Sequence, residues 1–256
     1  MKILVLGGTG FIGQNLIKSC PENWEIVSFA RSKKECGPNR TYLTGERSLG
    51  RSDYSSLKGQ SFDWIIDLSS YYLDQISDLL DCVDSTNYLY VSAVKVYRDL
   101  ENLPITDDNF LVEPLWDSSF DLDNVSYGRY KVACETLLRD CYRGRHTIIR
   151  PQVVIGEGDR SRRLKHWLAR SIAPGPRLAP GDGSDFLQVL DVLDLVLFMI
   201  RVIQSEVFGI FHLGGERVTW REFLFNLGYS DLVWVPVYQY DESDLAYSLK
   251  WEHKLL

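Results

Sequence analysis

A glycine-rich turn near the amino end constrains the fold of this chain more than any other feature. It contains four glycines, Gly7, Gly8, Gly10 and Gly13. Residues 3–6 before it are apolar and branched, as expected for a strand buried on both faces, and residues 11–18 change to the apolar spacing of a helix. The sequence therefore predicts a strand, a tight turn and a helix, in that order.

The glycines of this turn suit a phosphate-binding loop. Without a Cβ, Gly7, Gly10 and Gly13 allow the chain to reverse sharply and bring backbone N–H groups close to a pyrophosphate. The helix that follows directs free N–H groups and the positive end of its dipole to the same place. We therefore expect dinucleotide binding here; the alternative is a tight turn with a purely structural role.

The end of the next strand, predicted at 24–29, distinguishes between the two nicotinamide cofactors. An acid about 20 residues after the glycines would bind the ribose hydroxyls of NAD, whereas an arginine accommodates the 2′-phosphate of NADP. No acid stands here, because the chain reads Arg31, Ser32, Lys33 and Lys34. We expect NADP rather than NAD, with Arg31 and Ser32 as contacts. The alternative is a basic loop that contacts only solvent.

Strands and helices alternate along the first 150 residues. The predicted strands lie within 40–62 and at 62–68, 88–92 and 147–150, and the predicted helices at 73–83 and 126–142. Such alternation is typical of a doubly wound α/β fold with a parallel sheet and right-handed connections. Ligands of such folds bind at the carboxyl ends of the strands.

Composition and charge exclude several classes of protein. The 256 residues carry a net charge of −7, which argues against nucleic-acid binding through bulk positive charge. The five cysteines include no CxxC pair and the four histidines are scattered, so we expect reduced thiols in a cytosolic protein and no metal site. The first apolar run is too short for a signal peptide, and the longest, at 192–203, is too short to cross a bilayer.

The pair most suited to chemistry is Tyr127 with Lys131, a YxxxK motif at the start of the predicted helix. At this spacing the two side chains share a helix face, so the ammonium is expected to lower the pKa of the phenol toward the range of a general acid or base. The lysine can also hold the nicotinamide ribose. Tyr54 and Lys58 form a second YxxxK, but outside the expected cleft. The alternative is a packed Tyr127 with Lys131 paired to Glu135 on the helix surface.

A set of further motifs accompanies this pair along the chain. They are GGTGFIG at 7–13, DLSSY at 67–71, YVSAVKVY at 90–97, YGRYK at 127–131, RPQVVIG at 150–156, VLDLV at 192–196 and GIFHLGG at 209–215. In this ordered set, which covers most of its length, the chain resembles the extended short-chain dehydrogenase/reductase superfamily, in particular its NAD(P)-dependent epimerase/dehydratase branch.

The resemblance implies a Rossmann lobe at 1–150 and a smaller substrate lobe, mainly 151–256, with segments that return to the first. It implies that Tyr127 exchanges a proton with a substrate hydroxyl or carbonyl while a hydride passes to or from the nicotinamide, with Lys131 as its partner. The cofactor contacts that it implies are Phe11, Ile12, Leu68, Ser69, Pro151 and Val153. We expect Thr9, Ser92 and Lys131 to contact the cofactor as well.

The chain departs from this pattern at Ala93, where the family carries a catalytic serine or threonine. Losing one such donor typically lowers the rate by about 10²–10³. Either Ser92, Ser126 or Ser70 takes its place, Ser92 being the first candidate, or the reaction is slow or absent. A rival hypothesis is therefore a non-enzymatic NADP sensor or a scaffold for RNA or protein.

A basic stretch beyond the sixth strand gives the remaining candidates. Arg160, Arg162, Arg163 and Lys165 lie within 158–170, and Arg160 and Arg163 are the candidate substrate contacts. They would clamp a phosphate or carboxylate; the alternative is a solvated helix face. The leading hypothesis is an NADP-dependent oxidoreductase or epimerase/dehydratase acting on a small polar or sugar-like metabolite. The sequence favours no nucleic acid or membrane partner, and leaves a homodimer open.

Overall fold

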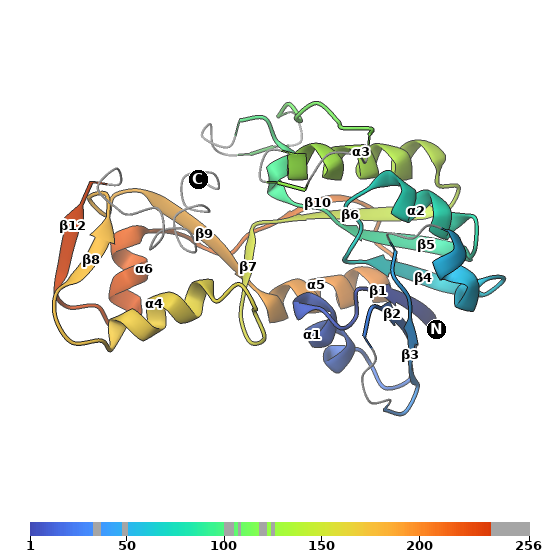
Figure 1. The fold of residues 1–256 in the computed structure, drawn as a ribbon, viewed down its shortest axis with the longest axis horizontal. Helices are drawn as coiled ribbons and strands as arrows, with labels where there is room; N and C mark the ends of the chain where they lie inside the picture. The colour runs from blue at the N-terminus through green and yellow to red at the C-terminus, as the bar shows by residue number, and fades with distance from the viewer. Residues whose placement is uncertain are drawn as a thin grey trace.

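The computed structural model describes residues 1–32, 37–47, 51–99, 105–106, 109–117, 122–123 and 126–236. A larger and a smaller lobe lie side by side, joined through β7 and β9 (Figure 1). The larger lobe is built on a seven-stranded parallel sheet with the order β10-β6-β5-β4-β1-β2-β3. Its strands are β1 (Lys2–Leu6), β2 (Glu25–Ala30), β3 (Arg40–Thr44), β4 (Ser61–Asp67), β5 (Asp84–Val91), β6 (Arg145–Pro151) and β10 (Gly209–Leu213).

Helices cover both faces of this sheet (Figure 1). They are α1 (Phe11–Ser19) and α5 (Val192–Ser205) on one face, and α2 (Leu73–Leu80) and α3 (Ser126–Cys141) on the other, with short 3₁₀ turns at Arg51–Leu57 and Val94–Val96. Because strand side chains alternate, Ile3 and Val5 pack toward α1 and α5, while Leu4 and Leu6 join the opposite core. Burial on both faces explains why β1 is apolar throughout.

The smaller lobe has its own apolar core. It is built from β7 (Val153–Ile155), α4 (Arg163–Ser171), β8 (Arg177–Pro180), β9 (Phe186–Asp191), β11 (Arg217–Thr219), α6 (Trp220–Asn226) and β12 (Leu232–Val235). Trp167 of α4 packs against Trp220, Leu224 and Tyr229, all of them buried. This lobe therefore has a core separate from those of the large sheet.

The strands and helices predicted from the sequence are present, and the doubly wound α/β fold is confirmed. The boundaries differ most between α2 and β5: the helix ends at Leu80 and the strand begins at Asp84, earlier than the predicted 88. The larger lobe also takes α5 and β10 from the second half of the chain. Across the described residues, no helix combines the length and apolarity needed to cross a membrane.

Candidate active site at the carboxyl edge of the sheet

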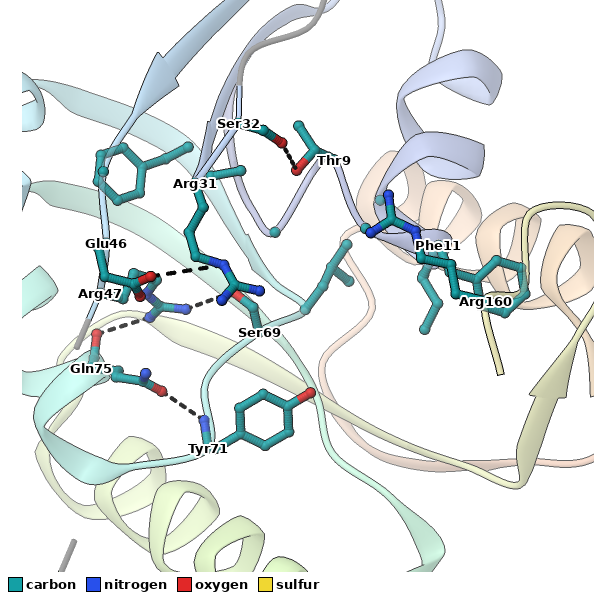
Figure 2. Close-up of a pocket in the computed structure, with 18 residues that line it drawn as sticks. Thr9, Phe11, Arg31, Ser32, Glu46, Arg47, Ser69, Tyr71, Gln75 and Arg160 are labelled. Atoms are coloured by element: carbon teal, nitrogen blue, oxygen red, sulfur yellow. Dashed lines mark hydrogen bonds and ion pairs between the residues drawn. The ribbon is translucent and has the colours of Figure 1, made fainter. Parts of the chain in front are cut away.

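A cavity of about 470 Å³ lies at the carboxyl end of β1 (Figure 2). The order of the strands reverses at β1, which has β2 on one side and β4 on the other. Ligands of doubly wound folds bind at this kind of switch point. The cavity is lined by Gly7, Thr9, Gly10, Phe11, Ile12, Gly13, Phe29, Ala30, Arg31, Ser32, Gly45, Glu46, Arg47, Leu68, Ser69, Tyr71, Gln75 and Arg160. The ends of β1, β2, β3 and β4 thus all contribute to one site.

The glycine turn leaves no room for side chains. Gly7 has φ +83°, in the left-handed region, and its carbonyl accepts a hydrogen bond from the Gly10 N–H at 2.9 Å. A Cβ on Gly13 would lie 2.4 Å from the Gly7 oxygen and 2.5 Å from the Cα of Gly8, so only glycine allows α1 to pack this closely. Gly10 precedes α1 without a side-chain cap. The first N–H groups of the helix therefore lack the side-chain acceptor that usually caps them and remain suited to an anion.

Arg31 and Ser32 lie at the end of this cavity that β2 and β3 form. The Arg31 side chain is 82% exposed, and its guanidinium lies 3.8 Å from the carboxylate of Glu46. Ser32 Oγ donates to Thr9 Oγ1 at 3.3 Å. The sequence shows no acid after β2, but the structure brings one to the same cavity from the end of β3. Lys33 and Lys34 lie outside the described residues.

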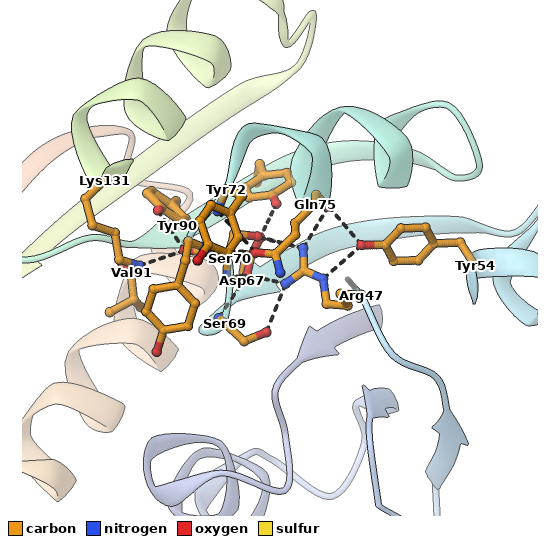
Figure 3. A network of polar contacts seen from close by, with 12 residues as sticks. Arg47, Tyr54, Asp67, Ser69, Ser70, Tyr72, Gln75, Tyr90, Val91 and Lys131 are labelled. Carbon is orange, nitrogen blue, oxygen red and sulfur yellow. Dashed lines mark hydrogen bonds and ion pairs between the residues drawn. The ribbon is translucent and has the colours of Figure 1, made fainter. Parts of the chain in front are cut away.

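Arg47 reaches from the end of β3 to the end of β4 and forms the centre of a buried polar network (Figure 3). All three guanidinium nitrogens donate hydrogen bonds, and the acceptors are Tyr54 Oη (2.9 Å), the two Asp67 carboxylate oxygens (3.1 and 3.3 Å), Ser69 Oγ (2.9 Å), Ser70 Oγ (2.6 Å) and the Gln75 carbonyl (2.9 Å). Tyr54, the tyrosine of the second YxxxK motif, thus belongs to this network.

The Arg47 charge is balanced inside the protein. Burial alone would raise the pKa of Asp67, but attraction to Arg47 and hydrogen bonds from Arg47, Ser70 and Tyr88 outweigh it and lower that pKa to about 2. Burial alone would lower the pKa of Arg47, but attraction to the carboxylate of Asp67 is the main effect that raises it, and the pKa lies above its ordinary value. Since its N–H groups already serve internal acceptors, Arg47 has little to offer a phosphate. Among the described cations that line the cavity, Arg31 and Arg160 are the ones outside this network.

Lys131 is fully buried, with its ammonium enclosed by polar and aromatic groups. Nζ donates to the carbonyls of Ser70 (2.9 Å) and Val91 (3.0 Å), and it lies 5.0 Å from the ring centroid of Tyr71 and 4.7 Å from that of Tyr90. Burial lowers the pKa of Lys131 to about 8. The predicted alternative of a surface pair between Lys131 and Glu135 is wrong.

Glu135 has a different partner on the buried side of the same helix. Its side chain is fully buried, and Oε2 lies 2.6 Å from a guanidinium nitrogen of Arg150. This ion pair ties α3 to β6 beneath the YxxxK motif. The helix face that carries Lys131 therefore packs into the protein rather than against solvent.

Tyr127 lies beside Lys131 but does not gain the expected shift. Its ring centroid is 5.8 Å from Lys131 Nζ and 5.9 Å from the Tyr71 ring. Burial raises the pKa of Tyr127, Tyr71 raises it further, and Arg163 partly opposes them. The expectation that Lys131 lowers this pKa is wrong, because the effect of burial dominates. The cation that opposes the rise in this pKa is Arg163, at the start of α4.

The remaining predicted residues fall into three groups. Gly7, Thr9, Gly10, Phe11, Ile12, Gly13, Arg31, Ser32, Leu68 and Ser69 line the cavity, and so does Arg160, which was predicted for the substrate. Tyr127, Lys131 and Arg163 cluster beside Tyr71. Ser92, Pro151 and Val153 are buried and are not among the lining residues. Of the basic stretch, Arg160 thus lines the cavity and Arg163 lies near Tyr127, so the two do not form one surface.

Sequence reasoning missed Glu46 and Arg47 as parts of the site, and it placed Tyr71 at the carboxyl edge of the sheet without assigning it to the site. Glu46 and Arg47 follow β3, an edge strand whose end is not marked by any motif. Tyr71 lies four residues after the end of β4, within the DLSSY motif, so an aromatic residue in the loop after a buried strand was a usable signal. Its location at the carboxyl edge would have placed it near the cofactor.

Comparison with known proteins agrees with this architecture. The sequence profile of the NAD dependent epimerase/dehydratase family matches residues 72–214. No curated protein sequence matches the chain.

Similar solved structures include the UDP-N-acetylglucosamine 4-epimerase of Bacillus cereus, with 17% identity, 100% of this chain and 95% of that chain covered, and a TM-score of 0.72. The UDP-glucuronic acid 4-epimerase of Bacillus cereus in complex with NAD has 16% identity, coverages of 97% and 91%, and a TM-score of 0.69. The dTDP-glucose 4,6-dehydratase of Bacillus anthracis in complex with NAD has 17% identity, coverages of 92% and 84%, and a TM-score of 0.67.

At these identities the likeness shows the fold. The family match, over more than half of the chain, shows that the protein belongs to the NAD dependent epimerase/dehydratase family, whose members are enzymes of the short-chain dehydrogenase/reductase type.

Proposed function

We propose that this protein is an NADP-dependent oxidoreductase or epimerase/dehydratase that acts on a sugar-like metabolite. The observation that carries the proposal is the cavity at the switch point, where the glycine turn, Arg31, Ser69 and Tyr71 line one space. Its volume of about 470 Å³ lies within the range of about 300–1,000 Å³ for small-molecule and cofactor sites.

The residues of the cavity fit a dinucleotide. The uncapped N–H groups at the start of α1, at Phe11 and Ile12, would hold the pyrophosphate, and Arg31 with Ser32 would hold the 2′-phosphate of NADP. Glu46 would oppose that phosphate through its negative charge, so the preference depends on whether Arg31 leaves Glu46 for the ligand. The bound nicotinamide would supply or accept a hydride.

Tyr127 is the proposed proton donor. Because its pKa is raised, the side chain is a neutral phenol near pH 7, the form that protonates the carbonyl oxygen of a substrate. Lys131 would position the site through the β4–α2 loop and β5, since its ammonium holds the carbonyls of Ser70 and Val91. In the reverse direction Tyr127 first loses its own proton to solvent and then, as the phenolate, takes the proton of a substrate hydroxyl.

A second cavity, of about 380 Å³, gives a place for the substrate. It is lined by Val94, Ile105, Gln152, Gln188, His212, Leu213, Gly214 and Arg217. Val94 follows β5, Gln152 follows β6 and Gly214 follows β10, so this cavity also lies at the carboxyl ends of strands. Gln152 Oε1 is buried without a hydrogen-bond partner among the described residues, and a sugar hydroxyl would supply one.

The test is turnover with defined probes. Purified protein is mixed with NADP⁺ or NAD⁺ and UDP-N-acetylglucosamine, UDP-glucuronic acid or dTDP-glucose, and reduction of the nicotinamide and isomerised or dehydrated products are measured. We expect turnover of at least one probe, its abolition in Tyr127→Phe, and nearly unchanged NADPH affinity in that variant. Full activity of Tyr127→Phe would remove the proposed mechanism.

A further inference from the structure

The family pattern requires a hydroxyl near the reacting oxygen, and this chain has alanine at the corresponding position, Ala93. The serine that precedes it, Ser92, has a buried Oγ and is not among the residues that line either cavity. Ser70 Oγ donates to Asp67, and Ser126 Oγ donates to Asp123 Oδ1 at 2.9 Å at the start of α3. Each serine that the sequence offered as a replacement is therefore buried or engaged elsewhere.

Tyr71 is differently placed. Its ring lines the dinucleotide cavity, at the end opposite Thr9 and Ser32 (Figure 2), and its centroid lies 5.9 Å from that of Tyr127. Its backbone N–H donates to Gln75 Oε1 at 2.8 Å, whereas its hydroxyl forms no hydrogen bond with the described part of the chain. Tyr71 thus joins the cavity to the YxxxK pair, which does not itself line the cavity.

The loop that carries Tyr71 is held from both sides (Figure 3). Arg47 binds the Oγ of Ser69 and Ser70, while Lys131 and Tyr90 donate to the Ser70 carbonyl at 2.9 and 3.1 Å. These contacts fix the backbone of the residue immediately before Tyr71. They therefore hold in place the backbone from which the Tyr71 side chain extends, which reduces the reorganisation that a donor at this position needs.

We propose that Tyr71 is a second phenol of the active site, whose hydroxyl donates a hydrogen bond to the reacting oxygen of the substrate in place of the hydroxyl that Ala93 lacks. The inference rests on the proposed function. Tyr127 transfers the proton: it gives it to the carbonyl oxygen as that carbon gains a hydride, and becomes a phenolate. Tyr71 keeps its proton throughout, and its hydrogen bond shortens as negative charge develops on the oxygen.

The protonation state of Tyr71 agrees with this role. Burial raises its pKa, and the carboxylate of Asp67 raises it further, with a smaller opposing effect of Arg31. The side chain is therefore a neutral donor across the physiological range. In this scheme only Tyr127 changes its charge, so no proton has to pass between the two phenols.

The test compares Tyr71→Phe with a matched control, Tyr72→Phe. The control removes a hydroxyl from the next residue, whose ring packs edge-on against Tyr130 and does not line the cavity. With the probe that the wild-type protein turns over, we expect kcat of Tyr71→Phe to fall by about 10², while KM and the NADPH dissociation constant change less than about threefold. Tyr72→Phe should match the wild type, and circular dichroism should show all variants folded.

A rescue variant separates a lost donor from a disturbed loop. Adding Ala93→Ser to Tyr71→Phe restores the hydroxyl of the family pattern. The kcat of this double variant should be at least about tenfold higher than that of Tyr71→Phe alone. If Tyr71→Phe has wild-type kcat, or if Ala93→Ser fails to raise the kcat of the variant, the assignment of Tyr71 is overturned while the proposed function stands. If the wild-type protein binds no dinucleotide, or turns over none of the probes, the proposed function and the Tyr71 assignment both fall.

Discussion

Replacing Asp67 with asparagine should strongly destabilise the protein, because it removes the charge that balances the buried Arg47. Asp67 is fully buried and accepts hydrogen bonds from Arg47, Tyr88 and the loop residues 69–70. Asparagine keeps the size but removes the charge, so the Arg47 guanidinium is left buried and unbalanced. Breaking a buried ion pair in this way costs about 3–5 kcal/mol, a large part of the total of about 5–15 kcal/mol that stabilises a domain.

The pKa of Asp67 gives a second measure of its interaction with Arg47. It falls from 3.8 to about 2 in the folded protein. At about 1.4 kcal/mol per pKa unit, the ionised form contributes about 2 kcal/mol relative to the protonated acid. Because the folded pKa is the lower one, this contribution is fully present above about pH 4 and is lost as the pH falls through 2. This value of about 2 kcal/mol is lower than the roughly 3–5 kcal/mol expected for Asp67→Asn, because a protonated Asp67 keeps part of the hydrogen-bond network.

The assay is urea unfolding at pH 7, followed by circular dichroism, with Asp63→Asn as the matched control. Asp63 lies on the same strand but is exposed, and it accepts a hydrogen bond from the Lys2 N–H that asparagine can also accept. We expect the control to stay within about 0.5 kcal/mol of wild type. Adding Arg47→Met to Asp67→Asn should recover part of the loss, because it removes the unbalanced charge. Equal stability of Asp67→Asn and Asp63→Asn would refute the reasoning.

Three further predictions concern the cavity and the smaller lobe. Gly13→Ala should weaken NADPH binding at least tenfold, about 1.4 kcal/mol, because the new Cβ would lie 2.4 Å from the Gly7 oxygen, whereas Gly37→Ala, with 3.9 Å to its nearest neighbour, should bind normally; equal affinities in fluorescence titration would contradict the proposed turn. Arg31→Ala should lower NADPH affinity about tenfold and leave NADH affinity within about twofold in calorimetry, and an equal effect on both would remove Arg31 as the phosphate contact. Trp167→Ala should destabilise the smaller lobe by about 3–5 kcal/mol in thermal unfolding, since Trp167 is buried against Trp220 and Tyr229; a loss below about 1 kcal/mol would contradict that core.

The architecture could be predicted because its signals are local. The apolar run before Gly7 and the helical spacing after it identify a strand, a turn and a helix without reference to the rest of the chain, and the structure has them at β1 and α1. The same spacing placed α3 correctly, from Ser126 to Cys141. Periodicity reports which faces are buried, and for these elements burial decides the conformation.

The chemistry of the site could not be predicted to the same degree, because it depends on contacts between distant segments. Arg47 and Asp67 are 20 residues apart and meet only because β3 and β4 end at the same edge of the sheet. Spacing placed Lys131 one helical turn from Tyr127, but it could not show that the ammonium would donate to the carbonyls of Ser70 and Val91. Nor could it show that burial would raise the pKa of Tyr127, so the predicted direction of that pKa shift was wrong.

The central claim is that the glycine turn and the cavity above it hold a nicotinamide dinucleotide, and a crystal structure of the protein grown with NADPH tests it most directly. We predict that the pyrophosphate lies against the N–H groups at the start of α1, the 2′-phosphate beside Arg31, and the nicotinamide at the end of the cavity near Tyr71. NADPH bound elsewhere, or a glycine turn that excludes it at saturating concentration, would contradict the account.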